Sequence, residues 1–167
     1  MNNKIELREY SLQYASAFAE MRNNPKIFEN GFDSTPNPYT TDVAIELFQK
    51  QIDKQTAERF LIFCNEQLCG EIGIWLKDDV QRLNVDLGYF VAEPFWGKGI
   101  ATEAIRLMVD YTFKTFDVIR IAAGVFEHNK ASMKALEKNG FILESIQKKA
   151  VVKNDRIMDD YMWVKFR

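Results

Sequence analysis

The sequence has few of the residues that build metal centres or disulfide frameworks. Its 167 residues include two cysteines, Cys64 and Cys69, and a single histidine, His128. A structural zinc site takes four cysteine or histidine ligands, so we expect no metal. The cysteines flank a predicted tight turn at residues 65–68. They could face each other across a hairpin, but we expect reduced, buried thiols because the chain shows no secretion signal.

Long apolar runs and an excess of one charge are also missing. No apolar stretch is long enough to cross a bilayer. There are 22 Lys and Arg residues against 24 Asp and Glu, which gives a formal net charge of −2. This balance offers no argument for nucleic acid or membrane as a partner, and we expect neither. The first residues lead directly into a strand pattern, so we expect no signal peptide and a cytoplasmic protein.

The composition is typical of one globular domain. Apolar residues make up 47% of the chain and charged residues 28%, and no repeat or linker interrupts it. A chain of this length is enough for one hydrophobic core. We therefore expect a single domain spanning residues 1–167.

Apolar periodicity predicts strands and helices in the order β-α-α-β-β-β-α-β-α-β-β. The predicted strands are 5–8, 59–64, 68–76, 86–91, 118–126, 141–152 and 156–166, and the helices are 11–21, 41–52, 100–113 and 129–139. Ser11 and Thr41 are the predicted caps of the first two helices. The order predicts an α/β fold in three layers, with one parallel β-α-β unit in a mixed sheet covered by helices on both sides.

The run Asp86–Ala101 is the centre of this pattern, because it reads as a strand, a short glycine turn and the start of a helix. At such a junction, free backbone N–H groups and the positive end of the helix dipole attract an anion. Gly97 and Gly99 allow unusual backbone angles and a close approach of a ligand, and Lys98 adds positive charge. The alternative is a tight turn whose glycines serve geometry alone. The run is neither a Walker A motif nor a full dinucleotide fingerprint.

Two motifs give the chain a family resemblance. Gly99-x-Ala101 matches the end of the pyrophosphate loop of the GNAT N-acetyltransferases, with Trp96 at the position where Arg or Gln is usual. Downstream, Asn129-x-x-Ser132 is followed by Lys138-Asn139-Gly140-Phe141. Together these motifs resemble the branch that contains the ribosomal-protein N-terminal acetyltransferases (RimJ/RimL-like). The resemblance covers nearly the whole chain.

The resemblance implies the GNAT fold, a mixed and mostly antiparallel sheet whose two central parallel strands splay apart to admit acetyl-CoA. It also implies acetyl-CoA as the co-substrate, and the loop at 25–39 as a wall of the acceptor cleft, although a plain surface loop is the alternative. The cofactor-binding residues that it implies are Tyr89, Phe90, Val91, Trp96, Gly97, Lys98, Gly99, Ile100, Ala101, Thr102, Asn129, Ser132 and Lys134.

The resemblance also implies catalytic roles. Many family members use a Tyr seven residues after the Asn to protonate the departing thiolate, but that position here is Leu136. Ser132 is the available donor, with Asn129 on the same side of the helix; their alternatives are a solvent-facing serine and a helix cap.

A carboxylate is needed to collect the proton of the acceptor amine. Asp86 stands where the branch usually carries a Glu, and it is the first candidate. Glu71, Asp159 and Asp160 are the alternatives, and each could instead be a structural or solvated carboxylate.

These residues predict an N-acetyltransferase that moves an acetyl group directly to a primary amine in a ternary complex. The acceptor is a small-molecule amine or the N-terminal amine of a peptide or protein. The rivals are a non-catalytic acyl-CoA-binding sensor or scaffold, and a structural oligomerisation domain. The protein is expected to be a monomer or a homodimer, with the last hairpin as a possible interface.

Overall fold

A computed structural model describes residues 3–167, and their contacts divide the chain into two compact units. Unit 1 comprises the residues up to Gly73 together with Tyr89–Ile100, and unit 2 comprises Ile74–Gly88 and Ala101–Arg167. Among these residues there are seven strands in the order β1-β2-β3-β4-β5-β7-β6. Strands β3 and β4 each contribute residues to both units.

Unit 1 is built on an antiparallel set of strands. Its elements are β1 Ile5–Arg8, α1 Ala15–Arg22, α2 Pro25–Phe28, α3 Thr41–Ile52, β2 Arg59–Cys64 and the first part of β3 Gln67–Leu76. Strand β2 pairs antiparallel with both β1 and β3. The β2–β3 hairpin turns at Asn65 and Glu66, whose φ angles of 49° and 68° suit a tight hairpin loop.

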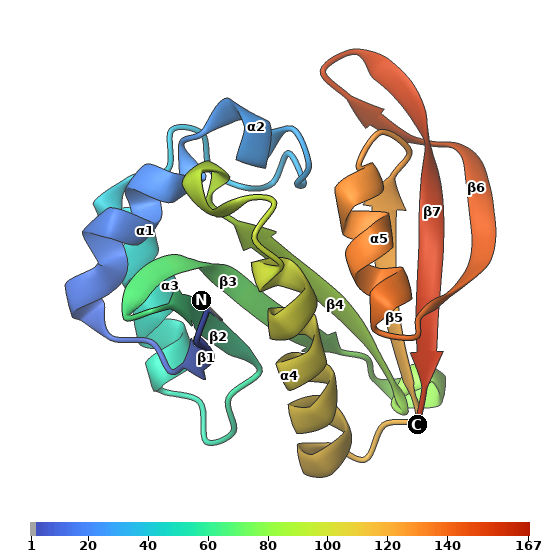
Figure 1. The fold of residues 1–167 in the computed structure, drawn as a ribbon, viewed down its shortest axis with the longest axis horizontal. Helices are drawn as coiled ribbons and strands as arrows, with labels where there is room; N and C mark the ends of the chain where they lie inside the picture. The colour runs from blue at the N-terminus through green and yellow to red at the C-terminus, as the bar shows by residue number, and fades with distance from the viewer. Residues whose placement is uncertain (1–2) are drawn as a thin grey trace. The chain divides into compact units, whose positions relative to one another are not determined.

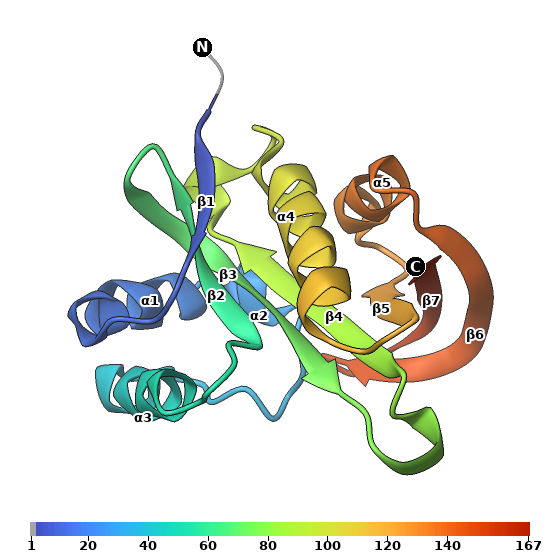
Figure 2. The same ribbon diagram turned by 90° about the horizontal axis from the view of Figure 1, so that it is seen from below.

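Aromatic side chains form the core of unit 1. Phe18 of α1 and Phe48 of α3 are fully buried, and their rings meet edge to face with centroids 5.1 Å apart. Helices α1 and α3 therefore pack together on the same side of β1 and β2 (Figure 2). Apolar residues recur at helical spacing in both helices, so each helix turns one apolar stripe toward this core.

Unit 2 contains the remaining elements. They are the first residues of β4 Asn84–Val91, most of α4 Ile100–Thr115, β5 Arg120–Phe126, α5 Lys130–Lys138, β6 Ile142–Lys153 and β7 Arg156–Phe166. Within the unit, α4 and α5 lie on the same side of β4 and β5 (Figures 1 and 2). The Asn139 side chain at the end of α5 donates to the Thr102 carbonyl of α4, at 3.0 Å, which ties the two helices together.

The strand pairing of unit 2 confirms the predicted mixed sheet. Strands β4 and β5 are parallel and pair over Asn84–Asp86 and Arg120–Ala122. Strand β5 continues to Phe126 and pairs antiparallel with β7 over its whole length. The parallel pair is thus joined for three residues, and every other pairing described is antiparallel.

Several element boundaries differ from the sequence prediction. The first helix begins with a 3-10 turn at Leu12–Tyr14, and the Ser11 side chain makes no capping bond. Thr40 caps α3 instead of Thr41, because its hydroxyl accepts a hydrogen bond from the Val43 N–H at 3.2 Å. The predicted irregular segment contains the short helix α2, which the Asn24 side chain caps. Local capping chemistry therefore shifts these ends by a residue or more.

Candidate active site

The glycine loop directly precedes helix α4. Gly97 and Gly99 have φ angles of +73° and +76°, and a Cβ built on either would meet no atom within 4 Å. Glycine tolerates these left-handed angles, and the missing side chains leave the loop backbone open. The opening is a place where a phosphate-bearing ligand could reach backbone N–H groups at the start of a helix.

Side chains of the loop fold back onto the chain before it. The indole Nε1 of Trp96 donates to the Val91 carbonyl at 2.5 Å, so Trp96 ties the loop to the end of β4. Lys98 Nζ donates to the Pro94 carbonyl at 2.9 Å and lies 5.4 Å from the centre of the Phe95 ring. Both side chains shape the loop, and this contact of Lys98 still leaves two of its three donors for other partners.

The end of β4 is packed firmly within unit 1. The Phe90 ring lies 5.6 Å from that of Phe18, and the Arg22 guanidinium stands 4.3 Å above it. A Cβ on Gly70 of β3 would collide with the Phe90 carbonyl oxygen, so this glycine permits the close approach of the two strands. Cys69 lies beside it, and its carbonyl accepts from the Ala92 N–H at 2.8 Å.

The strand order places β3, which carries Cys69, next to β4. Both cysteines are buried free thiols, and burial raises the pKa of Cys69 to about 12. A thiol that is neutral at physiological pH is a poor nucleophile.

Helix α5 carries the second motif. Asn129 is its N-cap, as predicted, because its side chain accepts from the Ser132 N–H at 3.2 Å. Ser132 is half-buried one turn into the helix, Lys134 is exposed, and Leu136 is fully buried. The position where many family members have a Tyr therefore belongs to the core, which leaves Ser132 as the hydroxyl of this motif.

Glu71, an alternative base, is a structural carboxylate. It is 3% exposed, and it accepts from the Tyr10 hydroxyl. It also forms ion pairs with Arg59 at 2.9 Å and Arg22 at 3.3 Å. Burial raises the pKa of Tyr10, so this hydroxyl stays protonated and keeps donating. Three partners, two of them cations, hold this buried carboxylate in place and compensate its charge, so it serves the structure.

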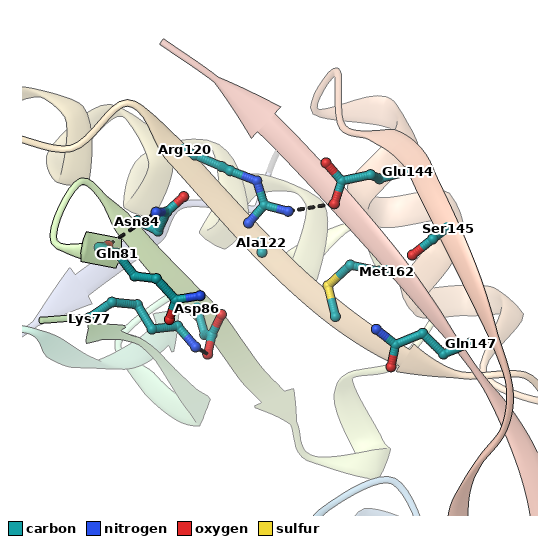
Figure 3. Close-up of a pocket in the computed structure, with 10 residues that line it drawn as sticks. All are labelled: Lys77, Gln81, Asn84, Asp86, Arg120, Ala122, Glu144, Ser145, Gln147 and Met162. Atoms are coloured by element: carbon teal, nitrogen blue, oxygen red, sulfur yellow. Dashed lines mark hydrogen bonds and ion pairs between the residues drawn. The ribbon is translucent and has the colours of Figure 1, made fainter. Parts of the chain in front are cut away.

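Asp86 lies in a polar cavity of about 370 Å³ within unit 2. The cavity is lined by Lys77, Gln81, Asn84, Asp86, Arg120, Ala122, Glu144, Ser145, Gln147 and Met162 (Figure 3). Asp86 forms an ion pair with Lys77, and Arg120 forms one with Glu144. The lining thus carries two cations and two anions, and its charge is balanced.

The two neighbouring aspartates of β7 differ in their surroundings. Asp159 accepts from Lys148 Nζ at 2.8 Å and from the Lys149 N–H at 2.9 Å, and these bonds lower its pKa. Asp160 has one oxygen, Oδ1, that is buried without a hydrogen-bond partner. Burial raises the pKa of Asp160, against an opposing effect of the Tyr161 and Val125 N–H groups.

One contact near the loop has no clear signal in the sequence. Glu93, in the turn before the loop, accepts from the Asn24 side chain at 2.7 Å and forms an ion pair with Lys26. These bonds join the segment around α2 to the turn that leads into the glycine loop, both within unit 1. A partner 69 positions away in the sequence leaves no local pattern that would reveal it.

Two kinds of feature are absent from the residues that the structure describes. Within residues 3–167, no group of three or more His, Cys, Asp or Glu side chains is arranged to hold a metal ion. Over the same residues, no helix is both long and apolar enough to cross a membrane.

Comparison with known proteins decides the family. The sequence model of the acetyltransferase (GNAT) domain matches residues 4–142. The chain belongs to the GNAT acetyltransferase family. The probable N-acetyltransferase YjcK of Bacillus subtilis is 38% identical over 106 residues, which cover 62% of this chain and 59% of YjcK. The match therefore spans little more than half of that relative.

Solved GNAT structures show the same fold. A RimL ribosomal L7/L12 alpha-N-protein acetyltransferase in complex with coenzyme A has a TM-score of 0.83 at 23% identity, covering 97% of this chain and 93% of that one. The spermidine N-acetyltransferase of Vibrio cholerae, with CoA and spermine, has a TM-score of 0.81 at 21% identity, covering 97% and 95%. The predicted family, fold and enzyme class are confirmed, whereas the roles of the site residues stay predictions.

Proposed function

We propose that this GNAT protein transfers an acetyl group from acetyl-CoA directly to the α-amine of a peptide-like acceptor. The open glycine loop in front of α4 carries the proposal, because it is the part of the fold suited to a pyrophosphate. Structures of the same fold contain CoA, among them the RimL complex and the spermidine N-acetyltransferase complex.

The residues present fit the co-substrate. Backbone N–H groups from Trp96 to Thr102 would hold the pyrophosphate, and Lys134 would approach the phosphates of the adenosine. The backbone of Tyr89–Val91 would pair with the amides of the pantetheine arm, as an added strand does. Bound acetyl-CoA supplies an activated thioester for transfer.

The remaining roles fall to side chains of unit 2. Ser132 would donate a hydrogen bond to the departing sulfur, held in place by its position one turn after the Asn129 cap. Asp86 is the predicted acceptor of the amine proton, and its ion pair with Lys77 keeps it oriented toward the cavity. No side chain is assigned as a covalent nucleophile, so both substrates would bind before transfer.

The charge of the cavity favours a peptide over a polyamine. A polyamine carries several ammonium groups and calls for an acidic lining, but this lining pairs Asp86 and Glu144 with Lys77 and Arg120. A peptide N-terminus brings one ammonium group followed by amides and mixed side chains. Amide groups can exchange hydrogen bonds with the neutral polar residues of the lining, such as Asn84.

Titration calorimetry with acetyl-CoA, CoA and ATP tests the co-substrate. We expect micromolar affinity for both CoA species and little for ATP. Acetylation is then measured with peptides that begin with Ser or Ala, and with spermidine. A higher kcat/KM for a peptide supports the proposal, and absence of CoA binding refutes it. Tight CoA binding without turnover of any amine would instead support the sensor, a reading that the buried Leu136 keeps open.

Ser132→Ala tests the proton donor. We expect kcat to fall about 100-fold with the acetyl-CoA affinity unchanged, since general acid catalysis contributes on the order of 10² or more. Lys138→Ala, at an exposed position of the same helix, is the matched control. An unchanged kcat in Ser132→Ala would remove Ser132 from the mechanism.

A further inference from the structure

Four carboxylates were candidates for handling the acceptor amine, and the structure separates them by their partners. Glu71 is paired with Arg22 and Arg59. Asp86 is paired with Lys77, and Asp159 with Lys148. Among residues 3–167, no ion pair of Asp160 is found, and its Oδ1 accepts no hydrogen bond.

An unpaired, partly buried carboxylate is costly for the fold. Its charged form loses water without gaining a cation, and the cost persists unless a cation arrives. In this protein the cost is visible as a raised pKa, for which burial is the largest cause. A group of this kind is a candidate for binding a charge that the protein itself does not supply.

The carboxyl group of Asp160 lies beside a glycine of the neighbouring strand. On β5, Gly124 has no side chain, and a Cβ there would lie 3.1 Å from Asp160 Oδ2. Gly124 is itself exposed. The carboxyl group therefore lies over the backbone of β5, next to an exposed residue, and the side chain of Asp160 as a whole is half-buried.

Strand register connects this place to the polar cavity. Asp160 stands opposite Gln147 of β6 and two residues before Met162 on β7, and both of these residues line the cavity. Gly124 is two residues after Ala122, which also lines it. Residues two apart on a strand, and residues opposite each other on paired strands, share one face of the sheet. By this register Asp160 lies on the same face of the sheet as the cavity and next to its lining residues.

We propose that Asp160 binds the ammonium group of the acceptor at the edge of this cavity and takes its proton. The inference rests on the proposed function, and it assigns to Asp160 the proton acceptance that the sequence predicts first for Asp86. Asp160 and the ammonium group would form a charge-assisted hydrogen bond, which is stronger in a partly desolvated site than in water. Gln147, directly opposite, is neutral and does not compete for the charge.

The step balances. The ammonium N–H bond breaks, and its proton moves to the carboxylate, which leaves a neutral amine and a neutral Asp160. The amine lone pair forms the C–N bond with the acetyl carbon as the C–S bond breaks, and the sulfur leaves as a thiolate. The second amine proton neutralises the thiolate, and Asp160 returns its proton to water. A carboxylate with a raised pKa is a better proton acceptor than an ordinary aspartate.

The test of binding does not require turnover. Protein labelled with ¹³C at the aspartate carboxyl groups is titrated with alaninamide, which has a free α-amine and no carboxylate. We expect a saturable shift of the Asp160 resonance, which Asp160→Asn identifies by removing it. N-acetylalaninamide, which lacks the ammonium group, is the control ligand and is expected to cause no such shift. Absence of a shift with alaninamide, or an equal shift with both ligands, overturns the proposal.

Kinetics then separate this proposal from the proposed function. With whichever amine the wild type acetylates, Asp160→Asn is expected to lower kcat/KM at least about tenfold, because a hydrogen bond to a charged group is lost. The affinity for acetyl-CoA stays unchanged. Asp155→Asn, the same substitution in the exposed turn of the β6–β7 hairpin, is the matched control. If the wild type is active and Asp160→Asn is equally active, the role of Asp160 is refuted and the proposed function stands. If the wild type acetylates no amine, the proposed function is refuted, and the NMR titration alone decides whether Asp160 binds an ammonium group.

Discussion

Single residues with open or unpaired surroundings stand out in this structure. Gly97 and Gly99 adopt left-handed backbone angles in front of α4, and nothing occupies the space where their side chains would be. Among residues 3–167, Asp160 has no ion pair, whereas Glu71 is held by three partners. The proposed chemistry depends on the first kind of residue, and stability depends on the second.

We predict that Gly99→Asn abolishes acetyl-CoA binding without unfolding the protein. Asparagine tolerates the left-handed region better than other non-glycine residues, so the strain is small, and its side chain would enter the open space at the loop. Calorimetry measures the affinity, and a thermal melt checks the fold. The melting temperature should change by no more than a few degrees. A variant that keeps its affinity would show that the loop does not hold the co-substrate.

We predict that Asp160→Asn stabilises the protein at neutral pH. Burial raises the pKa of Asp160, so the folded state binds its proton more tightly than the unfolded state. Stability then falls as the pH rises through the folded pKa, and the loss is complete above it. Below the ordinary aspartate pKa of about 3.9, both states are protonated and the effect vanishes.

Urea unfolding of both proteins at pH 7 and at acidic pH measures this difference. The advantage of Asp160→Asn should be present at pH 7 and shrink as the pH falls. A variant that is less stable than the wild type at pH 7 would mean that the carboxylate has a favourable partner after all.

At the scale of elements, helix α5 combines a structural and a functional role in one residue. Asn129 caps the helix through the Ser132 N–H, and the same residue is predicted to contact acetyl-CoA. The other end of α5 is tied to α4 by the Asn139 side chain. Because the prediction gives a second function to the side chain that caps the helix, substitutions at Asn129 must separate the two.

We predict that Asn129→Ser keeps the stability but loses acetyl-CoA affinity. Serine caps a helix about as well as asparagine, whereas Asn129→Ala should lose about 1 kcal/mol of unfolding free energy. The cofactor contact of the longer amide is lost in both. Urea unfolding and calorimetry give the two quantities. If Asn129→Ser binds acetyl-CoA as the wild type does, Asn129 is a helix cap and nothing more.

At the scale of the whole molecule, β3 and β4 are the strands that supply residues to both compact units. If one unit unfolded alone, the part of each strand in that unit would lose its hydrogen-bond partners. Its backbone N–H and C=O groups would then be left unpaired. The expectation of a single domain over residues 1–167 therefore stays a prediction that unfolding can test.

We predict one cooperative unfolding transition. Differential scanning calorimetry should give a calorimetric enthalpy equal to the van't Hoff enthalpy, as for a two-state domain. Circular dichroism and tryptophan fluorescence should report the same midpoint. Two separated transitions would show that the units unfold independently, and would contradict the single domain.

The sequence by itself determined what depends on neighbours along the chain. The glycine turn before α4 was predicted correctly, and the helix cap named as the alternative for Asn129 is present, because each is set by residues within one helical turn. The strand and helix order and the parallel pair also followed from local periodicity and connection length. The observed end of a helix differs from the predicted one where a neighbouring residue makes the capping hydrogen bond, as Thr40 does for α3.

The tertiary structure alone decided which carboxylates are free. The sequence left four candidates for the proton acceptor, and residue type does not distinguish them because all four are carboxylates. Glu71 is bound by Tyr10 and Arg22, which are 61 and 49 positions away, and Asp86 by Lys77 across a turn. Asp160 has no ion pair within the part of the chain that the structure describes, and its Oδ1 accepts no hydrogen bond there. The energy of an ion pair depends on the distance between the two charges in space. Folding brings together charges that are far apart in the sequence, so the sequence separation does not predict that distance.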